Sequence, residues 1–385
     1  MTTTSERVSE PLTQSASRRV SQSVFDGSRL RVVLLVNVYD GAQQQFLEAY
    51  EHLCSQVASV PGHVSDQLCQ SIENPSQWLI TSEWESAPPF LAWVNSEEHV
   101  QMVRPLHSCV RDTRSLRFHI VRETKGAASA GSTARRLQSA PRIGDGKIRH
   151  ALTFTVKPGS EPEVAKILAN YAPPEARVDA TTRLCRTSLF MHGNRVVRAI
   201  EVEGDLLAAL RHVAVEPAVR AAEEALNPYL EQERDLNDPE AARVFFTRAA
   251  VPAVHHVTSG QECPEAERHA LYYPARQGCG MRLARLLAQQ DEAAADDPGS
   301  PVCGSTIFQR DDIVVRLIDV RGGLDADPVL SLGLPDPAQA AELTTLLDGA
   351  AVGADGAALK GGDLAHFLTL ARMALITDRR SSPDA

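Results

Sequence analysis

The feature that most constrains the fold of this chain is an internal repeat. Residues 184–204 align without gaps to residues 302–322, with 8 identities in 21 positions. The match contains RVVRAIEVEG at 195–204 and IVVRLIDVRG at 313–322, and upstream RHALTFTVKPG (149–159) aligns with RHALYYPARQG (268–278). Such agreement indicates two copies of one structural unit, and a repeat has to be recognised before any fold is assigned.

Both copies show the same order of predicted elements. A strand is followed by an apolar-periodic helix, a hairpin with a polar turn, a second helix and a last segment that suits a strand or a helix. This β-α-β-β-α-β order is that of the ferredoxin-like fold. The predicted ranges in the two copies are 149–157 and 268–275, 162–171 and 281–290, 183–203 and 302–321, 205–230 and 335–347, 242–251 and 366–375.

The sequence before the repeat predicts the same order of elements, although its residues differ from those of the two copies. Residues 30–123 alternate strand and helix patterns in the same order, and a Gly/Ala/Ser-rich stretch separates them from the copies. We therefore predict an α+β protein of three tandem ferredoxin-like units of the dimeric α/β barrel type, with the second and third units forming a duplicated pseudo-dimer. The predicted parts are a disordered tail (1–28), a first unit (29–123), a linker (124–147), a second unit (148–258) and a degenerate third unit (259–378).

An arginine interrupts the apolar run of each repeated strand. With a period of two, Arg198 shares a face with Val196 and Ile200, and Arg316 occupies the same position in the other copy. Because both faces of these strands are apolar, we expect the sheets of the two copies to pack face to face. A buried guanidinium needs a partner. The alternatives are an ion pair, with a carboxylate that could come from the sister copy, and contact with an acidic ligand.

Composition excludes several classes of protein. The 385 residues carry a net charge of −10, which argues against nucleic-acid binding, and no apolar run is long enough to span a membrane. The N-terminus lacks the apolar core of a secretory signal, so we expect a cytoplasmic protein. The seven cysteines include no C-x-x-C, which predicts free thiols and no metal site, and His255–His256 is expected in a connector. Nucleotide and nucleophile motifs are absent.

The first unit resembles the antibiotic biosynthesis monooxygenase family. The resemblance rests on Pro61-Gly62 before the second strand, Trp84 at the end of the third strand, and the Phe90-x-x-Trp93 helix that follows. The second and third units resemble the SchA/CurD-like domain of aromatic-polyketide and spore-pigment gene clusters. That likeness rests on RHALTFTVKPG, FMHGNRVVRAIEVEGDL and the helix 217–229, and it is weaker in the third unit.

These resemblances imply a function. Enzymes of the monooxygenase family make quinones from phenolic polycycles with molecular oxygen and often need no metal or flavin. The implied activity is a cofactor-independent oxidation of an aromatic polyketide in antibiotic or pigment biosynthesis, by a homodimer that works beside polyketide cyclases. The alternative is a non-redox polyketide-binding or cyclase-assisting protein. Haem degradation, known from relatives of the same plan, is disfavoured because no histidine matches the ligand position.

Candidate site residues follow from the same resemblance. Asn37 and Trp84 match positions of the family's active cleft, and His99 or His107 is expected to act as a base or to orient an enolate. For each there is a structural alternative: a strand-edge amide, a core tryptophan, and histidines that are solvated or cap a helix. The expected substrate-binding residues are Tyr39, Trp93, Arg198 and Arg316; no metal ligand is expected.

Overall fold

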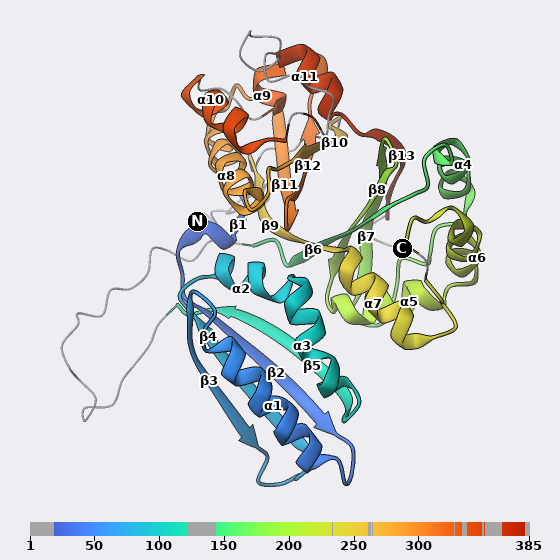
Figure 1. The fold of residues 1–385 in the computed structure, drawn as a ribbon. Helices are drawn as coiled ribbons and strands as arrows, with labels where there is room; N and C mark the ends of the chain where they lie inside the picture. Colours follow the sequence, from blue (N-terminus) through green and yellow to red (C-terminus); the bar gives the residue numbers. More distant parts are fainter. Residues whose placement is uncertain are drawn as a thin grey trace, which may run out of the picture.

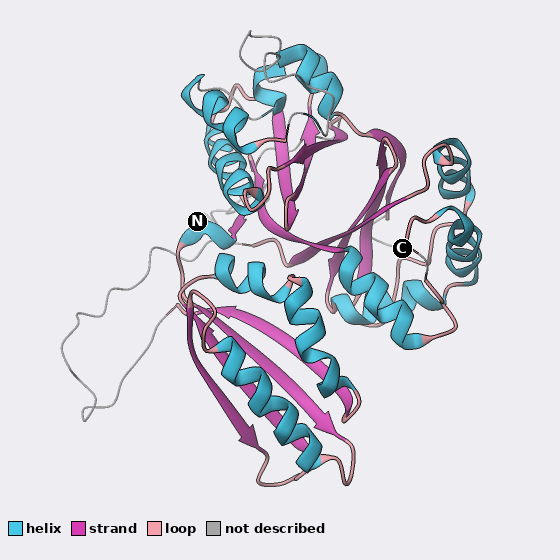
Figure 2. Ribbon diagram, in the orientation of Figure 1, coloured by secondary structure: helices cyan, strands magenta, loops and turns pink. Residues whose placement is uncertain are grey.

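The computed structural model describes residues 19–121 and 144–381, apart from 233, 261–262, 264, 327, 333–336, 349 and 351–363. These residues form two β-sheets, each covered by helices (Figures 1 and 2). One sheet has four strands and belongs to the first unit, and the other has nine strands and contains both copies of the repeat. The boundary at residue 259 stays a prediction, because the larger sheet runs continuously across it.

The first unit has the strand order of a ferredoxin-like fold, β3-β4-β2-β5. Its helices lie on one face of the sheet, where Leu30, Val32 and Val36 pack into the apolar core with Phe46 and Trp84. The other face carries no helix of this unit. The elements are β2 (Leu30–Val38), α1 (Gln43–Val57), β3 (His63–Gln70), β4 (Gln77–Trp84), α2 (Ala87–Val94), α3 (Glu97–His107) and β5 (Val110–His119).

The two copies of the repeat contain matching elements. In the second unit these are β6 (Lys147–Thr155), α4 (Glu161–Asn170), β7 (Arg183–His192), β8 (Arg195–Glu203), α5 (Leu206–Val215), α6 (Pro217–Leu226), α7 (Pro239–Ala249) and β9 (Ala250–Thr258). In the third unit they are β10 (Glu267–Pro274), α8 (Gly280–Asp296), β11 (Val302–Arg310), β12 (Ile313–Val320), α9 (Pro328–Leu332), α10 (Pro337–Leu346), α11 (Leu364–Ala371) and β13 (Ala374–Arg380). The last segment of each copy is therefore a helix followed by a strand.

The copies are joined by an exchange of their last strands. β9 of the second unit pairs with β11 of the third, and β13 of the third unit pairs with β7 of the second. The resulting order, β10-β12-β11-β9-β6-β8-β7-β13, curves into a barrel with helices outside it (Figure 1). The expected face-to-face packing of two separate sheets is wrong. The sheets join edge to edge instead, which satisfies the backbone groups of four edge strands.

The strand pair β9 with β11 has the same register as the strand pair β13 with β7. Thr306 of β11 lies opposite His256 of β9, and Ser188 of β7 lies opposite Asp378 of β13. Since Ser188 and Thr306 occupy equivalent positions of the repeat, His256 and Asp378 are equivalent too. The barrel therefore has a pseudo-two-fold axis, and residues can be compared across it position by position.

Residues 19–28, which precede the first unit, contain secondary structure and contact the barrel. β1 (Ser21–Ser23) pairs with His255–Val257 of β9, and Val20 is buried. Arg19 forms an ion pair with Glu292 of α8. The predicted disordered tail is thus wrong for residues 19–28, and its residues 1–18 lie outside the described residues. Most of the predicted linker, residues 124–143, lies outside them as well.

Two further expectations are corrected. Cys263 and Cys303 form a disulfide, so not all seven cysteines are free thiols. His255 and His256 lie in β9 and are buried, rather than in a connector. Among the described helices, none is both long and apolar enough to cross a membrane.

The helices α2 and α3 of the first unit lie against the barrel. Arg248, at the end of α7, forms an ion pair of 2.5 Å with Glu97 of α3. Arg310 of β11 donates a hydrogen bond of 3.0 Å to the carbonyl oxygen of Asn95. These contacts place the segment between α2 and α3 next to one end of the barrel.

Candidate functional site

An aromatic cluster fills the first unit between β4 and its two following helices. The indole of Trp84 is fully buried, stacks on Trp93 with ring centroids 5.4 Å apart, and donates to Ser82 Oγ at 2.6 Å. The imidazole of His99 packs edge-on against Trp93, with the two ring centroids 4.4 Å apart. Three predicted site residues therefore come together, because Trp84 ends its strand where α2 begins and His99 lies in the first turn of α3.

Two polar groups of this cluster can interact with a ligand. The Nε1 atom of Trp93 is buried and has no hydrogen-bond partner among the described residues. Burial lowers the pKa of His99 to about 4, and the nearby His107 adds to this effect. At neutral pH the cluster therefore presents an indole N–H donor and an uncharged imidazole.

Asn37 and Tyr39 lie elsewhere. Asn37 pairs with Gln77 and Asp112, whereas Trp84 pairs with Leu30 at the opposite end of β2. Seven residues of strand separate the two positions by about 23 Å, and their odd spacing puts the side chains on opposite faces of the sheet. The expectation that Asn37 and Trp84 share one cleft is therefore wrong within a single chain.

The remaining first-unit candidates have local contacts. The Tyr39 ring is 44% exposed and lies under the guanidinium of Arg111. His107, at the end of α3, has its Nε2 atom 3.1 Å from Arg243 Nη2. Neither residue belongs to the aromatic cluster.

Arg198 and Arg316 form ion pairs with carboxylates of their own units. Arg198 Nη1 lies 2.6 Å from Glu223 of α6, and Arg316 Nη2 lies 2.5 Å from Asp291 of α8. Both side chains point to the helices outside the barrel, since their partners are helical. The ion-pair alternative is thus the correct one, the sister copy does not supply the partner, and the substrate-binding assignment of both arginines is withdrawn.

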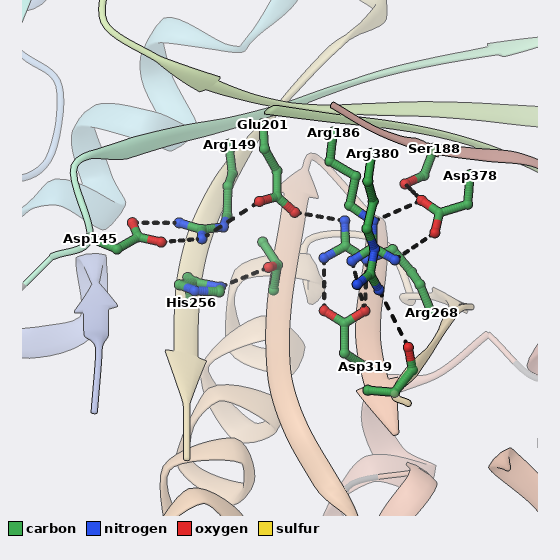
Figure 3. A network of polar contacts seen from close by, with 12 residues as sticks. Asp145, Arg149, Arg186, Ser188, Glu201, His256, Arg268, Asp319, Asp378 and Arg380 are labelled. Carbon is green, nitrogen blue, oxygen red and sulfur yellow. Dashed lines mark hydrogen bonds and ion pairs between the residues drawn. The ribbon is translucent and has the colours of Figure 1, made fainter. Parts of the chain in front are cut away.

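A network of charged side chains fills one end of the barrel interior (Figure 3). Arg268 of β10 forms ion pairs with Glu201 of β8 at 2.7 Å and with Asp319 of β12 at 2.8 Å. Arg186 of β7 lies 3.1 Å from Asp319 and 2.6 Å from Asp378 of β13. These residues come from both copies, so the network joins the second and third units. We call it the charged end of the barrel.

The charges of this network hold one another in the ionised form. Burial alone would lower the pKa of Arg268, but Asp319 and Glu201 raise it above its usual value. Burial would raise the pKa of Asp319, but Arg268, Arg186 and Arg380 lower it. Buried charges persist only when they are paired in this way. The charged end is therefore a fixed structural feature at neutral pH.

A cavity opens beside the charged end, between β10 and β13. Its volume is about 910 Å³. At one side of the cavity Met373 N, directly before β13, donates a hydrogen bond of 2.9 Å to the Ala270 carbonyl oxygen of β10. We call it the seam cavity; it is lined by Phe190, Glu265, Ala266, Glu267, Arg268, His269, Thr369, Arg372, Met373, Ala374, Leu375, Asp378 and Arg380.

Comparison with known proteins places the chain in a family. It is 63% identical to polyketide synthase CurD of Streptomyces cyaneus over 94% of this chain and 98% of that protein. It is 61% identical to protein SchA of Streptomyces halstedii over 94% and 96% of the two chains. The chain belongs to the SchA/CurD family. A 42.8 kDa protein in the whiE locus of Streptomyces coelicolor is 58% identical over 99% of this chain.

Family models match two parts of this SchA/CurD protein. The antibiotic biosynthesis monooxygenase model matches residues 29–105, and the SchA/CurD-like domain model matches residues 147–259. The first match includes the whole aromatic cluster. The second covers the first copy of the repeat.

Two solved structures that are similar to part of this SchA/CurD protein each cover about a quarter of it. SnoaB from Streptomyces nogalater, a cofactor-independent oxygenase, is 16% identical over 25% of this chain and 96% of that chain, with a TM-score of 0.24. A putative antibiotic biosynthesis monooxygenase from Bordetella bronchiseptica is 14% identical over 24% and 96%, with a TM-score of 0.23. Neither likeness supports a statement about function.

Sequence reasoning missed the interior of the SchA/CurD barrel. Its signal was present in the repeated RHAL motif, which supplies Arg149 to one half of the charged end and Arg268 to the other. The carboxylates Glu201 and Asp319 lie on the strands next to them. A repeated arginine and a repeated acid, both on the interior face, mark this site.

Proposed function

We propose that this protein oxidises a phenolic aromatic polyketide with molecular oxygen, without a metal or flavin, at the aromatic cluster of the first unit. The observation that carries the proposal is the buried, unpartnered Nε1–H of Trp93 beside the uncharged imidazole of His99. A buried donor without a partner is uncommon unless a ligand satisfies it. The match of the monooxygenase model to residues 29–105 and the naming of the CurD relative support the reaction and the substrate class.

The proposed reaction requires a base, a hydrogen-bond donor for the oxyanion and an apolar wall from the protein. His99 Nε2 or Nδ1 accepts the phenolic proton, and the resulting anion passes one electron to oxygen, which overcomes the spin barrier to direct reaction. The radical pair combines to a peroxide anion, and return of the proton from His99 gives a hydroperoxide, which loses water and leaves a quinone. One substrate and one oxygen molecule thus give one quinone and one water. The Trp93 N–H stabilises the oxyanion, and the rings of Trp84 and Phe90 supply the apolar wall.

The test is oxygen uptake by chelator-treated protein with an anthrone as substrate. We expect turnover without added flavin or NADPH, and a loss of about a hundredfold in kcat for His99→Gln. His52→Gln is the matched control, because His52 is an exposed histidine of α1 in the same unit. Trp93→Phe should lower kcat more than it raises KM, since an oxyanion donor acts mainly in the transition state.

The alternative function makes the opposite prediction. A polyketide-binding or cyclase-assisting protein without redox chemistry binds the polycycle but consumes no oxygen. Absence of uptake by metal-free wild-type protein, or uptake only with flavin and NADPH, contradicts the proposed oxidation.

We further propose that the chain forms a homodimer through its first unit. In the barrel, the second strand of each copy pairs with the fourth strand of the other, as β7 does with β13 and β11 with β9. The equivalent strands of the first unit, β3 and β5, are the two edges of their sheet. Pairing β3 of one chain with β5 of another leaves no free edge. A strict monomer in analytical ultracentrifugation contradicts this assembly.

A further inference from the structure

The barrel has two seams, one in each copy of the repeat, where the first strand of the copy meets its last strand. The repeat makes the two seams equivalent in position, but their structures differ. At one seam β6 pairs with β9 over three residue pairs, from His150 with Pro252 to Leu152 with Ala250. At the other seam, no pairing between β10 and β13 is present among the described residues, and one isolated bridge joins Leu271 of β10 to Arg372, two residues before β13. The pseudo-two-fold axis is therefore broken at the second seam.

The N-terminal strand explains the difference. β1 lies along β9, with Gln22 opposite His256. The position on β13 equivalent to His256 is Asp378, which lines the seam cavity. The seam cavity is thus the counterpart of the space that β1 occupies in the other half of the barrel. No described strand fills the equivalent position beside β13, so a slot remains there between β13 and β10.

The walls of this slot combine apolar and cationic groups. Phe190 and Met373 are buried side chains at its lining, and Leu375 is 52% exposed although it is a large apolar residue. Arg380 donates to the Ala266 carbonyl oxygen at 3.3 Å and, among the described residues, forms no ion pair with a carboxylate. Among the described residues, the carboxylate partner of Arg372 is Asp325, which is 77% exposed. Arg380 therefore offers a guanidinium group to an acidic ligand.

The other charged residues at the seam cavity differ in how strongly they affect a bound ligand. Arg268 and Asp378 are held in the network of the charged end. Glu265 and Glu267 are exposed at the rim, where water and salt screen their charges. Among the described cations that line the cavity, Arg380 is the one with no ion pair to a carboxylate, and it lies close enough to Asp319 to lower the pKa of that residue.

We propose that the seam cavity binds a flat aromatic acid, with its rings against Phe190, Met373 and Leu375 and its carboxylate or phenolate at Arg380. The volume of about 910 Å³ is within the usual range for small-molecule sites. The choice of a polycyclic ligand rests on the proposed function, whereas the position of its acid group rests on the cavity itself. The cavity is a second site, separate from the aromatic cluster of the first unit.

Binding of anthraquinone-2-carboxylate to the full chain tests this site by isothermal titration calorimetry. Arg380→Gln should weaken binding about tenfold, the value of one charge-assisted hydrogen bond. Arg379→Gln is the matched control, because Arg379 is the neighbouring residue of β13 and bonds to the Tyr171 carbonyl oxygen instead. Anthraquinone-2-carboxamide should bind wild-type protein more weakly and should respond little to Arg380→Gln.

A blocking variant gives a second measurement. Ala374 is exposed at the cavity, so Ala374→Trp should fill it, abolish binding of the probe and leave the unfolding temperature nearly unchanged. Equal binding by wild-type protein, Arg380→Gln and Ala374→Trp overturns the proposal, as does equal affinity of the wild-type protein for the carboxylate and the carboxamide.

The outcome is separable from that of the proposed oxidation, because binding is measured without oxygen uptake. Probe binding in a protein that consumes no oxygen leaves the seam cavity assigned and removes the oxidation. Oxygen uptake in a protein that does not bind the probe removes the seam cavity alone.

Discussion

The two repeated arginines should differ in their contribution to stability, although the sequence around them is nearly the same. Arg316 and Asp291 are both fully buried, and among the described residues the Asp291 carboxylate also accepts a hydrogen bond of 2.6 Å from the Ser305 hydroxyl. Arg316→Met therefore leaves a buried carboxylate without a cation. Breaking a buried pair in this way costs about 3–5 kcal/mol of unfolding free energy.

Arg198 should be less critical. Its partner Glu223 also forms an ion pair of 2.7 Å with Arg234, so Arg198→Met leaves the carboxylate paired. The expected cost is that of one charge-assisted hydrogen bond, about 1.5–3 kcal/mol. Replacing both members of the fully buried pair, in Arg316→Met/Asp291→Leu, should recover most of the loss, because no unpaired charge remains.

Urea unfolding followed by two probes measures these differences. All three tryptophans lie in the first unit, so tryptophan fluorescence reports that unit and far-ultraviolet circular dichroism reports the barrel as well. The barrel transition should shift in Arg316→Met while the fluorescence transition stays in place. Equal losses for the two single variants, or no recovery in the double variant, refute the argument from unpaired charge.

Three further outcomes are expected. Burial lowers the pKa of His150 to about 4 and of His256 to about 3, so the unfolded state binds more protons below pH 6.5 and the unfolding temperature should fall as the pH decreases from 6.5 to 4. Reducing the disulfide of Cys303, which closes 40 residues, should destabilise the barrel by about 4 kcal/mol, measured by urea unfolding with and without dithiothreitol. Asp319→Asn should destabilise the barrel by about 2–4 kcal/mol, since it removes a partner of both Arg186 and Arg268; an unchanged urea midpoint contradicts this.

Local structure was predictable because local sequence determines it. The predicted hairpin of 183–192 with 195–203 is β7 and β8 of the structure, since β-branched runs flank a Gly-Asn turn. The repeat likewise predicted that both copies would have one fold. What could not be predicted was the exchange of β9 and β13, because strand pairing between distant segments has no local signal.

The candidate site was predicted only in part for the same reason. Trp84, Trp93 and His99 are near in sequence and come together. Asn37 comes from another strand, and only the register of β2 with β4 shows that it faces away from Trp84. The partners of Arg198 and Arg316 lie on helices. The apolar pattern did not predict how these helices are rotated about their axes, so it did not predict which carboxylates face the arginines.

The exchange of last strands has a consequence for synthesis of the chain on the ribosome. β7 ends at His192 and its partner β13 begins at Ala374, 182 residues later. At a synthesis rate of about 5–20 residues per second, the edge of β7 stays unpaired for roughly 10–40 s before β13 is made. During that time a nascent chain exposes an unpaired strand that can associate with other chains. Slower aggregation at low expression temperature, and protection of the nascent chain by chaperones, follow from this single feature of the fold.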